Sequence, residues 1–257
     1  MNIPVDCAKA TTRALHELML AGDSAEVFIQ ELTYLAAGTF STQTRVECSV
    51  TYRPTSSGAL TVASSSAAVV LMDEAQYDVD DGPCLRALST GHVTYVHDTS
   101  TDLRWPHFFR SVQRLGFRSV LGLPLWIGEQ GAAALNLYAS EPDFFDHTMQ
   151  EAAEDFAQQG GSTLEMLLRH ENAQQQALNL QAAMTSRTII DLAVGIVMGQ
   201  NRCSQAEAFE IVKNASNHQN MKVRIIAQRL IEAVTTETPT THFTDGAGSE
   251  GGLPLRA

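Results

Sequence analysis

The stretch SRTIIDLAVGIVM at residues 186–198 decides the fold of the C-terminal part of the chain. From Ile189 to Met198 it continues a helical pattern of apolar residues spaced three and four apart. The following residues 201–203 have the composition of a turn, and Ser204 with Glu207 three positions later fits the capping box that opens a helix. The stretch therefore predicts the first helix of a compact helical group.

Two more helices follow. The first carries apolar residues on one face, at Ala208, Phe209, Val212 and Ala215. We expect Phe209 to pack in the core, although an aromatic ring can also stack on a base. Residues 217–220 break the chain, and residues 221–234 form the last helix with its own apolar face. Together the three helices predict a small bundle over residues 185–235.

A long helix leads into this bundle. Residues 146–184 are rich in Ala, Gln, Glu, Leu and Met, with the spacing of a coiled-coil seam. Gly160 and Gly161 favour a kink, because a glycine inside a helix costs about 1 kcal/mol relative to alanine. A seam on a single helix needs a partner, so we expect a homodimer.

The strand signal lies upstream, in residues 25–145. Residues 46–52 alternate as in a half-buried strand, and residues 119–127 and 132–138 form a hairpin. We also expect a strand through the apolar run at residues 68–71. The chain thus predicts an α+β fold: a mostly antiparallel, sensor-like sheet flanked by helices, then a long coiled-coil helix and a C-terminal three-helix bundle.

The charge is distributed unevenly along the 257 residues. The net charge is −12, of which −11 belongs to residues 1–163, while residues 164–236 carry +1. A polyanion is therefore tolerated only by the C-terminal helices, and we expect no binding to double-stranded DNA. Residues 1–24 indicate a helical segment, and residues 236–257, rich in Thr, Gly and Pro, predict a disordered tail.

Composition also bears on compartment and cofactors. The sequence lacks an apolar run of the ~18 residues that span a bilayer and shows no secretory signal, so we expect a cytoplasmic protein without a membrane partner. The four cysteines form no CxxC pair, which argues against a disulfide framework and a zinc site. The histidines lack metal-ligand spacing, and we expect no metal.

The C-terminal motifs carry a family resemblance. Residues 186–198, then QNRCS at 200–204, EAF at 207–209 and NMK at 220–222 closely resemble the ANTAR domain. ANTAR proteins are bacterial RNA-binding transcription antiterminators. The chain departs from the family at Val194, where many ANTAR domains have Lys, so one potential phosphate contact is absent.

The upstream part resembles a GAF domain of the type that precedes ANTAR in bacterial regulators. The matching motifs include DGPC at 81–84, RWP at 104–106, GFRSVL at 116–121 and LNLY at 135–138. The two resemblances imply a GAF sensor, a coiled coil that transmits the signal, and paired ANTAR domains that bind tandem stem-loops of a nascent transcript. Holding that RNA prevents a terminator hairpin, which implies a regulator and not an enzyme.

Recognition of an RNA hairpin needs cations for the phosphates and polar side chains for loop bases. The candidate RNA-binding residues are Arg187, Arg202, Lys213, Asn220 and Lys222, which we select because they lie near helix ends and turns. Asn220 has an alternative role as an N-cap. Gly195 and Gly199, four apart on one helix, predict close helix packing.

The GAF-like domain predicts a sensory pocket for a small-molecule ligand, with Cys84, Trp105 and Trp126 as candidate lining residues. Cys84 lies in the first turn of a predicted helix, whose dipole would lower the thiol pKa. We expect a buried structural thiol there, with a redox or ligand-sensing role as the alternative. Two other functions stay open. One is a thiol-dependent methionine sulfoxide reductase in which Cys48 and Cys84 meet, and the other is a regulator that acts through protein–protein interaction.

Overall fold

The computed structural model describes residues 13–15, 17–18, 24–53 and 59–235. The chain divides at Asn172 into two compact units. The expected tail at residues 236–257 and most of the expected helical segment at residues 1–24 lie outside the described residues.

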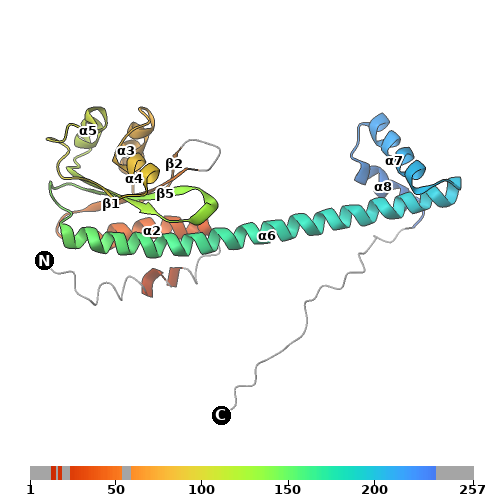
Figure 1. Ribbon diagram of the computed structural model, residues 1–257, viewed down its shortest axis with the longest axis horizontal. Helices are drawn as coiled ribbons and strands as arrows, with labels where there is room; N and C mark the ends of the chain where they lie inside the picture. Colours follow the sequence, from red (N-terminus) through yellow and green to blue (C-terminus); the bar gives the residue numbers. More distant parts are fainter. Residues whose placement is uncertain (1–12, 16, 19–23, 54–58, 236–257) are drawn as a thin grey trace, which may run out of the picture. The chain divides into compact units, whose positions relative to one another are not determined.

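Five antiparallel strands form the sheet of the N-terminal unit (Figure 1). They are β1 (Val46–Arg53), β2 (Leu60–Ser64), β3 (Thr94–Val96), β4 (Ser119–Leu125) and β5 (Ala132–Ala139), in the spatial order β2-β1-β5-β4-β3. The central strand β5 reads AAALNLYA, and all but its first residue are buried. It pairs with β1 over its full length, from Val46 opposite Ala139 to Arg53 opposite Ala132. The predicted α+β fold with an antiparallel sheet is confirmed.

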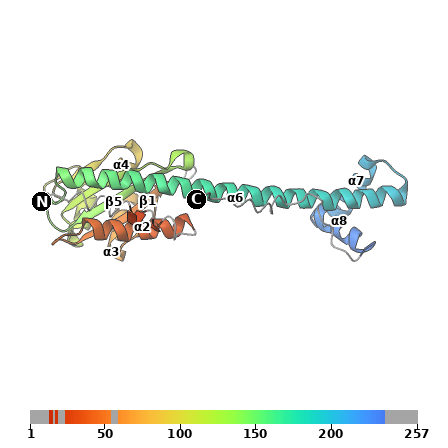
Figure 2. The ribbon, with the colours of Figure 1, turned by 90° about the horizontal axis from the view of Figure 1, so that it is seen from below.

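Helices cover both faces of this sheet. On one face lie α2 (Ala25–Phe40) and the first part of α6 (His147–Asn201); on the other lie α3 (Ala67–Tyr77), α4 (Pro83–Thr90) and α5 (Pro106–Arg114) (Figures 1 and 2). A short 3-10 turn, η1 (Gly128–Gln130), joins β4 to β5.

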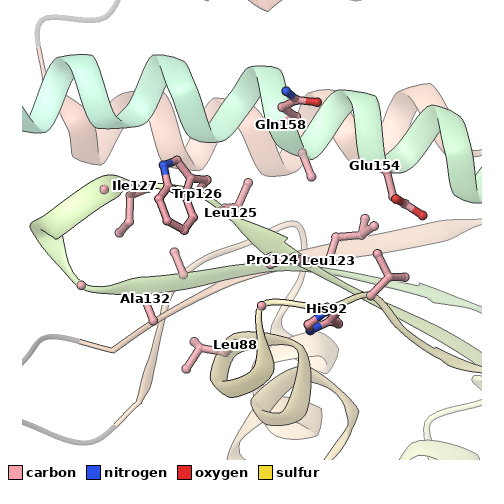
Figure 3. Close-up of a pocket in the computed structure, with 16 residues that line it drawn as sticks. Leu88, His92, Leu123, Pro124, Leu125, Trp126, Ile127, Ala132, Glu154 and Gln158 are labelled. Carbon is pink, nitrogen blue, oxygen red and sulfur yellow. The ribbon is translucent and has the colours of Figure 1, made fainter.

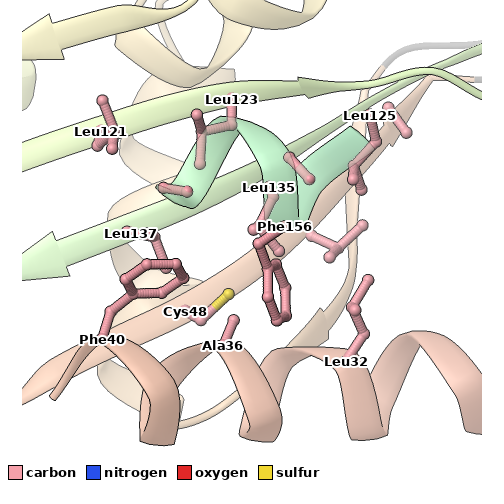
Figure 4. Packing of buried hydrophobic residues seen from close by; sticks show 14 of the residues in the cluster. Leu32, Ala36, Phe40, Cys48, Leu121, Leu123, Leu125, Leu135, Leu137 and Phe156 are labelled. Carbon is pink, nitrogen blue, oxygen red and sulfur yellow. The ribbon is translucent and has the colours of Figure 1, made fainter. Parts of the chain in front are cut away.

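The core under α2 and α6 is apolar. Phe40 of α2 meets Phe156 of α6 edge-on with ring centroids 5.7 Å apart, and Cys48 of β1 belongs to the same buried cluster (Figure 4). This cluster joins the first part of α6 to the sheet by hydrophobic burial, which stabilises a domain more than any other single contribution.

The expected strand at residues 68–71 is wrong, because these residues lie in α3. The buried side chains of α3 are Val69, Met72, Asp73 and Gln76, which repeat at helical spacing. Two of the four are polar, so the apolar pattern of the helix is incomplete in the sequence.

Helix α6 continues without a break through Gly160 and Gly161, where the sequence favours a kink. The two glycines allow close packing instead. A Cβ at Gly160 would lie 3.1 Å from Leu32 of α2, and one at Gly161 would lie 2.9 Å from both the backbone nitrogen and the backbone oxygen of Trp126. At Gly161 the helix therefore lies directly against the chain that follows β4.

In the C-terminal unit the end of α6 packs with α7 (Gln205–Gln219) and α8 (Val223–Glu232). The shared core is apolar and consists of Ile189, Ala193, Val194, Val197, Ala208, Val212, Ile226, Ala227 and Ile231. The predicted three-helix group is therefore present. Val194 is only 3% exposed, so this position contributes to packing and not to a phosphate-binding surface.

By length and composition alone, one described helix, α6, could cross a membrane. Packing accounts for part of the apolar residues near its end, since Ile189, Ala193 and Val197 are buried against α7 and α8, although only 22% of the apolar window is buried. Arg187 and Asp191 interrupt the same stretch. We therefore interpret this stretch of α6 as the core helix of the C-terminal unit.

Candidate nucleic-acid interface

The turn between α7 and α8 shapes the main polar surface of the C-terminal unit. Asn220 ends α7 with a left-handed backbone (φ 50°), a conformation that asparagine adopts more readily than most residues. The buried hydroxyl of Ser216 donates to the carbonyl of Met221, whose own amide donates to the carbonyl of Ser216 over 3.0 Å. Asn220 is thus the C-cap of α7 and not an N-cap, and it is exposed.

A groove of about 800 Å³ lies beside this turn. Its lining residues are Ser186 and Ile190 of α6 and the segment from Asn220 to Ile225. The segment contributes two exposed cations, Lys222 and Arg224, and the described residues that line the groove include no carboxylate.

The N-terminus of α8 opens beside these cations. Lys222 occupies the N-cap position and forms no side-chain cap. Within the described chain, the amides of Val223 and Arg224 have no hydrogen-bond acceptor, because the first bonded amide of α8 is that of Ile225, 2.8 Å from the carbonyl of Lys222. Free amides and the positive end of the helix dipole attract anions, whereas cations placed there destabilise a helix. The cations at the N-terminus of α8 therefore destabilise the helix itself, whereas together with the free amides they attract a phosphate.

The structure brings together only part of the predicted RNA-binding set. Asn220 and Lys222 line the groove, and Arg187 follows the lining residue Ser186 and lies 3.7 Å from Asp191. Arg202 follows Asn201, the last residue of α6, which lies roughly 22 Å from Ser186 at the rise of an α-helix. Lys213, in the middle of α7, is paired with Glu210 at 3.0 Å.

Three features of this unit differ from the sequence-based predictions. The first is that Arg224 joins the groove, and its position two residues after Lys222 in the first turn of α8 is the signal for it. Second, Phe209 is 40% exposed, so the prediction that it packs in the core is wrong. Third, a Cβ at Gly195 or Gly199 would meet no other described element within 4 Å, so neither glycine packs closely against another part of the described chain.

The capping box predicted at Ser204 is present and fixes the turn that carries Arg202. The Ser204 hydroxyl accepts from the Glu207 amide at 3.3 Å, and the Ser204 amide donates to the Glu207 carboxylate at 2.9 Å. These bonds satisfy donors that the first turn of α7 would otherwise leave open.

Replacing Ser204 by alanine should destabilise the C-terminal unit by about 1 kcal/mol, because the cap on the Glu207 amide is lost. Thermal unfolding followed by far-ultraviolet circular dichroism measures the change. Ser204→Thr keeps the hydroxyl and should recover most of the loss. Equal loss in both variants would show that the hydroxyl does not stabilise α7.

The three predicted sensory residues do not meet. Cys84 and Trp105 are buried in one cluster on the side of α3, α4 and α5, where the Trp105 indole donates to Asp81 over 2.8 Å. Trp126 is 74% exposed and follows β4 beside α6.

Cys84 belongs to a buried polar cluster with Asp73 and Tyr138. The Tyr138 hydroxyl donates to Asp73 Oδ1 at 2.5 Å and lies 3.1 Å from Cys84 Sγ, while Thr61 donates to Asp73 Oδ2 at 2.9 Å. Burial raises the pKa of Asp73 to about 6, against the lowering effect of these hydrogen bonds. Burial also raises the pKa of the Cys84 thiol, so Cys84 is the buried thiol expected by default and its burial outweighs the helix dipole.

The two thiols of the proposed reductase lie in separate clusters. Cys48 packs in the apolar core under α2 and α6, and Cys84 packs on the other side of the sheet. Both are free and fully buried, and burial raises the pKa of each. Because the thiolate is the reactive form, neither is activated for thiol chemistry. Among the residues that the structure describes, no three His, Cys, Asp or Glu side chains gather as a metal site.

Family models match both parts of the chain. The GAF domain model matches residues 24–165, and the ANTAR domain model matches residues 178–231. No curated protein sequence matches the chain.

Solved structures also resemble the N-terminal unit. One is the GAF domain region of a putative membrane protein from Geobacter sulfurreducens PCA, 14% identical, with a TM-score of 0.46, covering 55% of this chain and 93% of that chain. Another is the GAF domain of a phosphoenolpyruvate-protein phosphotransferase from Acinetobacter, 14% identical, with a TM-score of 0.47, covering 64% of this chain and 97% of that chain.

Proposed function

Since the chain belongs to the GAF domain family and carries an ANTAR domain after its GAF domain, we propose that it stabilises tandem stem-loops of nascent transcripts and so prevents termination. The ANTAR domain implies RNA-binding regulation by antitermination, and the GAF domain implies a sensor. The finer proposal is that a signal received by the GAF domain controls RNA binding in the cytoplasm.

The observation that carries the proposal is the uncapped start of α8. Free amides of Val223 and Arg224, the side chains of Lys222 and Arg224, and the exposed amide of Asn220 share one groove. The cations and amides suit phosphates, and the Asn220 side chain can hydrogen-bond a base that is splayed out of a loop. We include Arg187 because it follows Ser186, which lines this groove.

A homodimer is supported by the middle of α6. Every residue from 173 to 184 is exposed, including Leu180 (63%) and Met184 (39%), which lie four apart on one face of the helix. Most helical stability in proteins comes from packing of an apolar face, and a second copy of the chain would supply that packing for this segment. Two ANTAR domains on one dimer would bind two linked stem-loops with avidity, even if each contact is modest.

A regulator fits this architecture better than an enzyme does. The buried, separate thiols of Cys48 and Cys84 give no support to a methionine sulfoxide reductase. Action through protein–protein contact stays an outcome of the test below, because the exposed Phe209 and Ile211 offer an apolar surface on α7.

The test measures binding of the full-length protein to RNA pools with randomised loops, carrying either one stem-loop or two in tandem, across a salt series. We expect a preference for the tandem RNA. The double variant Lys222→Ala/Arg224→Ala should weaken that binding at least tenfold. It should also lower the slope of log affinity against log salt by about 1.5, because about 0.7–0.9 counterions are released for each phosphate contact.

A matched control separates this site from net charge. Arg86→Ala/Arg110→Ala removes two exposed cations from the GAF domain and should leave RNA binding unchanged. Equal losses in the two double variants would show that the groove is not the RNA site. Absence of binding to either RNA pool would overturn the function and favour a protein partner for the C-terminal unit.

A further inference from the structure

A pocket of about 550 Å³ lies within the N-terminal unit, between the end of β4, the end of α4 and the first part of α6 (Figure 3). Its volume falls in the range of pockets that hold small molecules, about 300–1,000 Å³. The pocket exists because β3 is short: its Thr94 pairs with Gly122, so residues 123–125 of β4 have no strand on that side. Pro124, which has no amide hydrogen, stands at this open edge.

The lining is apolar with a few polar groups. Leu88, Val93, Leu123, Leu125, Ala132, Ala133 and Ala157 contribute most of the apolar lining. Trp126 adds an indole ring that is 74% exposed, which is a large apolar surface to leave in water. This pocket is separate from the buried cluster that contains Cys84 and Trp105.

The charge of the lining is negative. Glu154 of α6 is the only residue among the sixteen in the lining with a formal charge at neutral pH, and no Lys or Arg lines the pocket. Figure 3 shows the Glu154 carboxylate on the side of α6 that faces β4. His92 Nδ1 lies 2.8 Å from the carbonyl of Thr90, which can only accept, so a neutral His92 offers Nε2 as another acceptor. An indole face, a carboxylate and an acceptor suit a cation.

The segment 126–130, which forms one wall of the pocket, is held against α6. The backbone of Trp126 lies against Gly161, the Glu165 carboxylate lies over Gly128, and Asn172 donates to the Gln130 side chain at 2.7 Å. Glu171 also accepts from the Ala25 amide at 2.7 Å, at the start of α2. These contacts follow α6 to Asn172, the last residue of the N-terminal unit. A molecule between β4 and α6 therefore lies next to the contacts that hold this part of the helix.

We propose that this pocket is the sensory site and that it takes a small organic cation, a protonated amine on an aromatic or apolar body. The ammonium group pairs with Glu154 and the apolar body packs on Trp126. Binding changes the contacts of the 126–130 segment with α6. The regulatory consequence rests on the proposed RNA-binding function, whereas binding to the pocket does not.

Binding is tested on the full-length protein with three probes of similar size: 2-phenylethylammonium, neutral 3-phenylpropanol and anionic 3-phenylpropionate. Tryptophan fluorescence reports it, since Trp126 is exposed and the other tryptophan, Trp105, is buried. We expect the cation to bind at least tenfold more tightly than the anion. Calorimetry should show that Trp126→Ala weakens binding of the cation at least tenfold, through loss of the apolar contact.

Two matched variants isolate the charge. Glu154→Gln should weaken binding of the cation about fivefold and leave 3-phenylpropanol unchanged, because an exposed carboxylate such as Glu154 contributes up to about 1 kcal/mol to an ion pair. Asp155→Asn removes a neighbouring exposed carboxylate that does not line the pocket and should change nothing. Equal affinity for cation and anion, equal effects of the two variants, or no binding of any probe would each overturn the site.

Coupling is measured separately, as RNA affinity with and without saturating 2-phenylethylammonium. A change of RNA affinity in the wild type that is lost in Trp126→Ala supports a sensory role. Binding of the probe without any change of RNA affinity overturns the sensory role and leaves a ligand site. If the protein does not bind RNA at all, the proposed function fails while the fluorescence result still decides the pocket.

Discussion

Replacement of Gly161 by alanine should lower the free energy of unfolding of the N-terminal unit by about 2 kcal/mol. The added Cβ would lie 2.9 Å from the backbone nitrogen and oxygen of Trp126, and real Cβ contacts are almost never this short. Backbone atoms cannot swing aside as a side-chain end can, so α6 or the end of β4 must shift. Overpacking of this kind costs about 1–3 kcal/mol, which outweighs the helix propensity that alanine gains over glycine.

The matched control is Gly38 of α2, an exposed helical glycine in the same unit. A Cβ at Gly38 meets no described atom within 4 Å, so Gly38→Ala should stabilise the unit by about 0.5–1 kcal/mol. Urea unfolding followed by tryptophan fluorescence reads both variants, since Trp105 and Trp126 lie in this unit. We expect Gly161→Ala to lower the free energy of unfolding and Gly38→Ala to raise it. A shift of the same sign for both variants would show that α6 does not pack tightly at Gly161.

The buried carboxyl of Asp73 should make the N-terminal unit less stable as the pH rises from about 4 to about 6. Burial raises its pKa in the folded protein from 3.8 to about 6, so over this interval the folded state holds a proton that the unfolded state has released. The free energy of unfolding then falls with pH, and this contribution levels off above the folded pKa. A shift of about two pKa units corresponds to about 3 kcal/mol.

Chemical unfolding at a series of pH values, compared between the wild type and Asp73→Asn, isolates this contribution. Asp73→Asn should remove the fall between pH 4 and 6, while Glu74→Gln, the exposed neighbour on α3, should keep most of it. Other carboxylates act in the opposite direction, since the hydrogen bonds from Arg118 lower the pKa of Asp98. If Asp73→Asn and the wild type have parallel pH profiles, Asp73 does not change protonation on unfolding.

The features that local pattern determines were predictable from the sequence. The capping box at Ser204 and Glu207 depends on two residues three apart, and it forms as expected. The hairpin of β4 and β5 follows from two apolar runs around a glycine-containing turn. In both cases the signal and the structure span the same few residues, so no distant contact is needed to interpret them.

The predictions are wrong where contacts with other parts of the chain determine the structure or the surroundings of a residue. The apolar run at residues 68–71 predicts a strand, whereas the chain forms α3 with Asp73 and Gln76 on its buried face. Tyr138, which is far along the chain, and the nearby Cys84 supply hydrogen bonds to these two polar residues. Cys84 lies in the first turn of α4 as predicted, yet burial of its thiol raises the pKa and outweighs the effect of the helix dipole. The sequence predicts a kink at Gly161, whereas the glycine allows α6 to pack directly against the backbone of Trp126.

The candidate groove was predictable in part. Asn220 and Lys222 were identified from their place in a turn, but the sequence could not tell that Arg202 belongs to the other end of the helical group. That distinction depends on the antiparallel course of α6 and α7. Phe209 shows the same limit: helical spacing assigns a face, and only the packing of α7 shows that this residue stands at the edge of that face.

The two buried cysteines, Cys48 and Cys84, allow the opening of each side of the sheet to be measured separately. A thiol reagent can modify Cys48 only when the α2 and α6 side opens, and Cys84 only when the α3, α4 and α5 side opens. The ratio of their modification rates therefore reports how often one side of the sheet opens relative to the other. A molecule that tightens one side would slow one of the two reactions and leave the other unchanged.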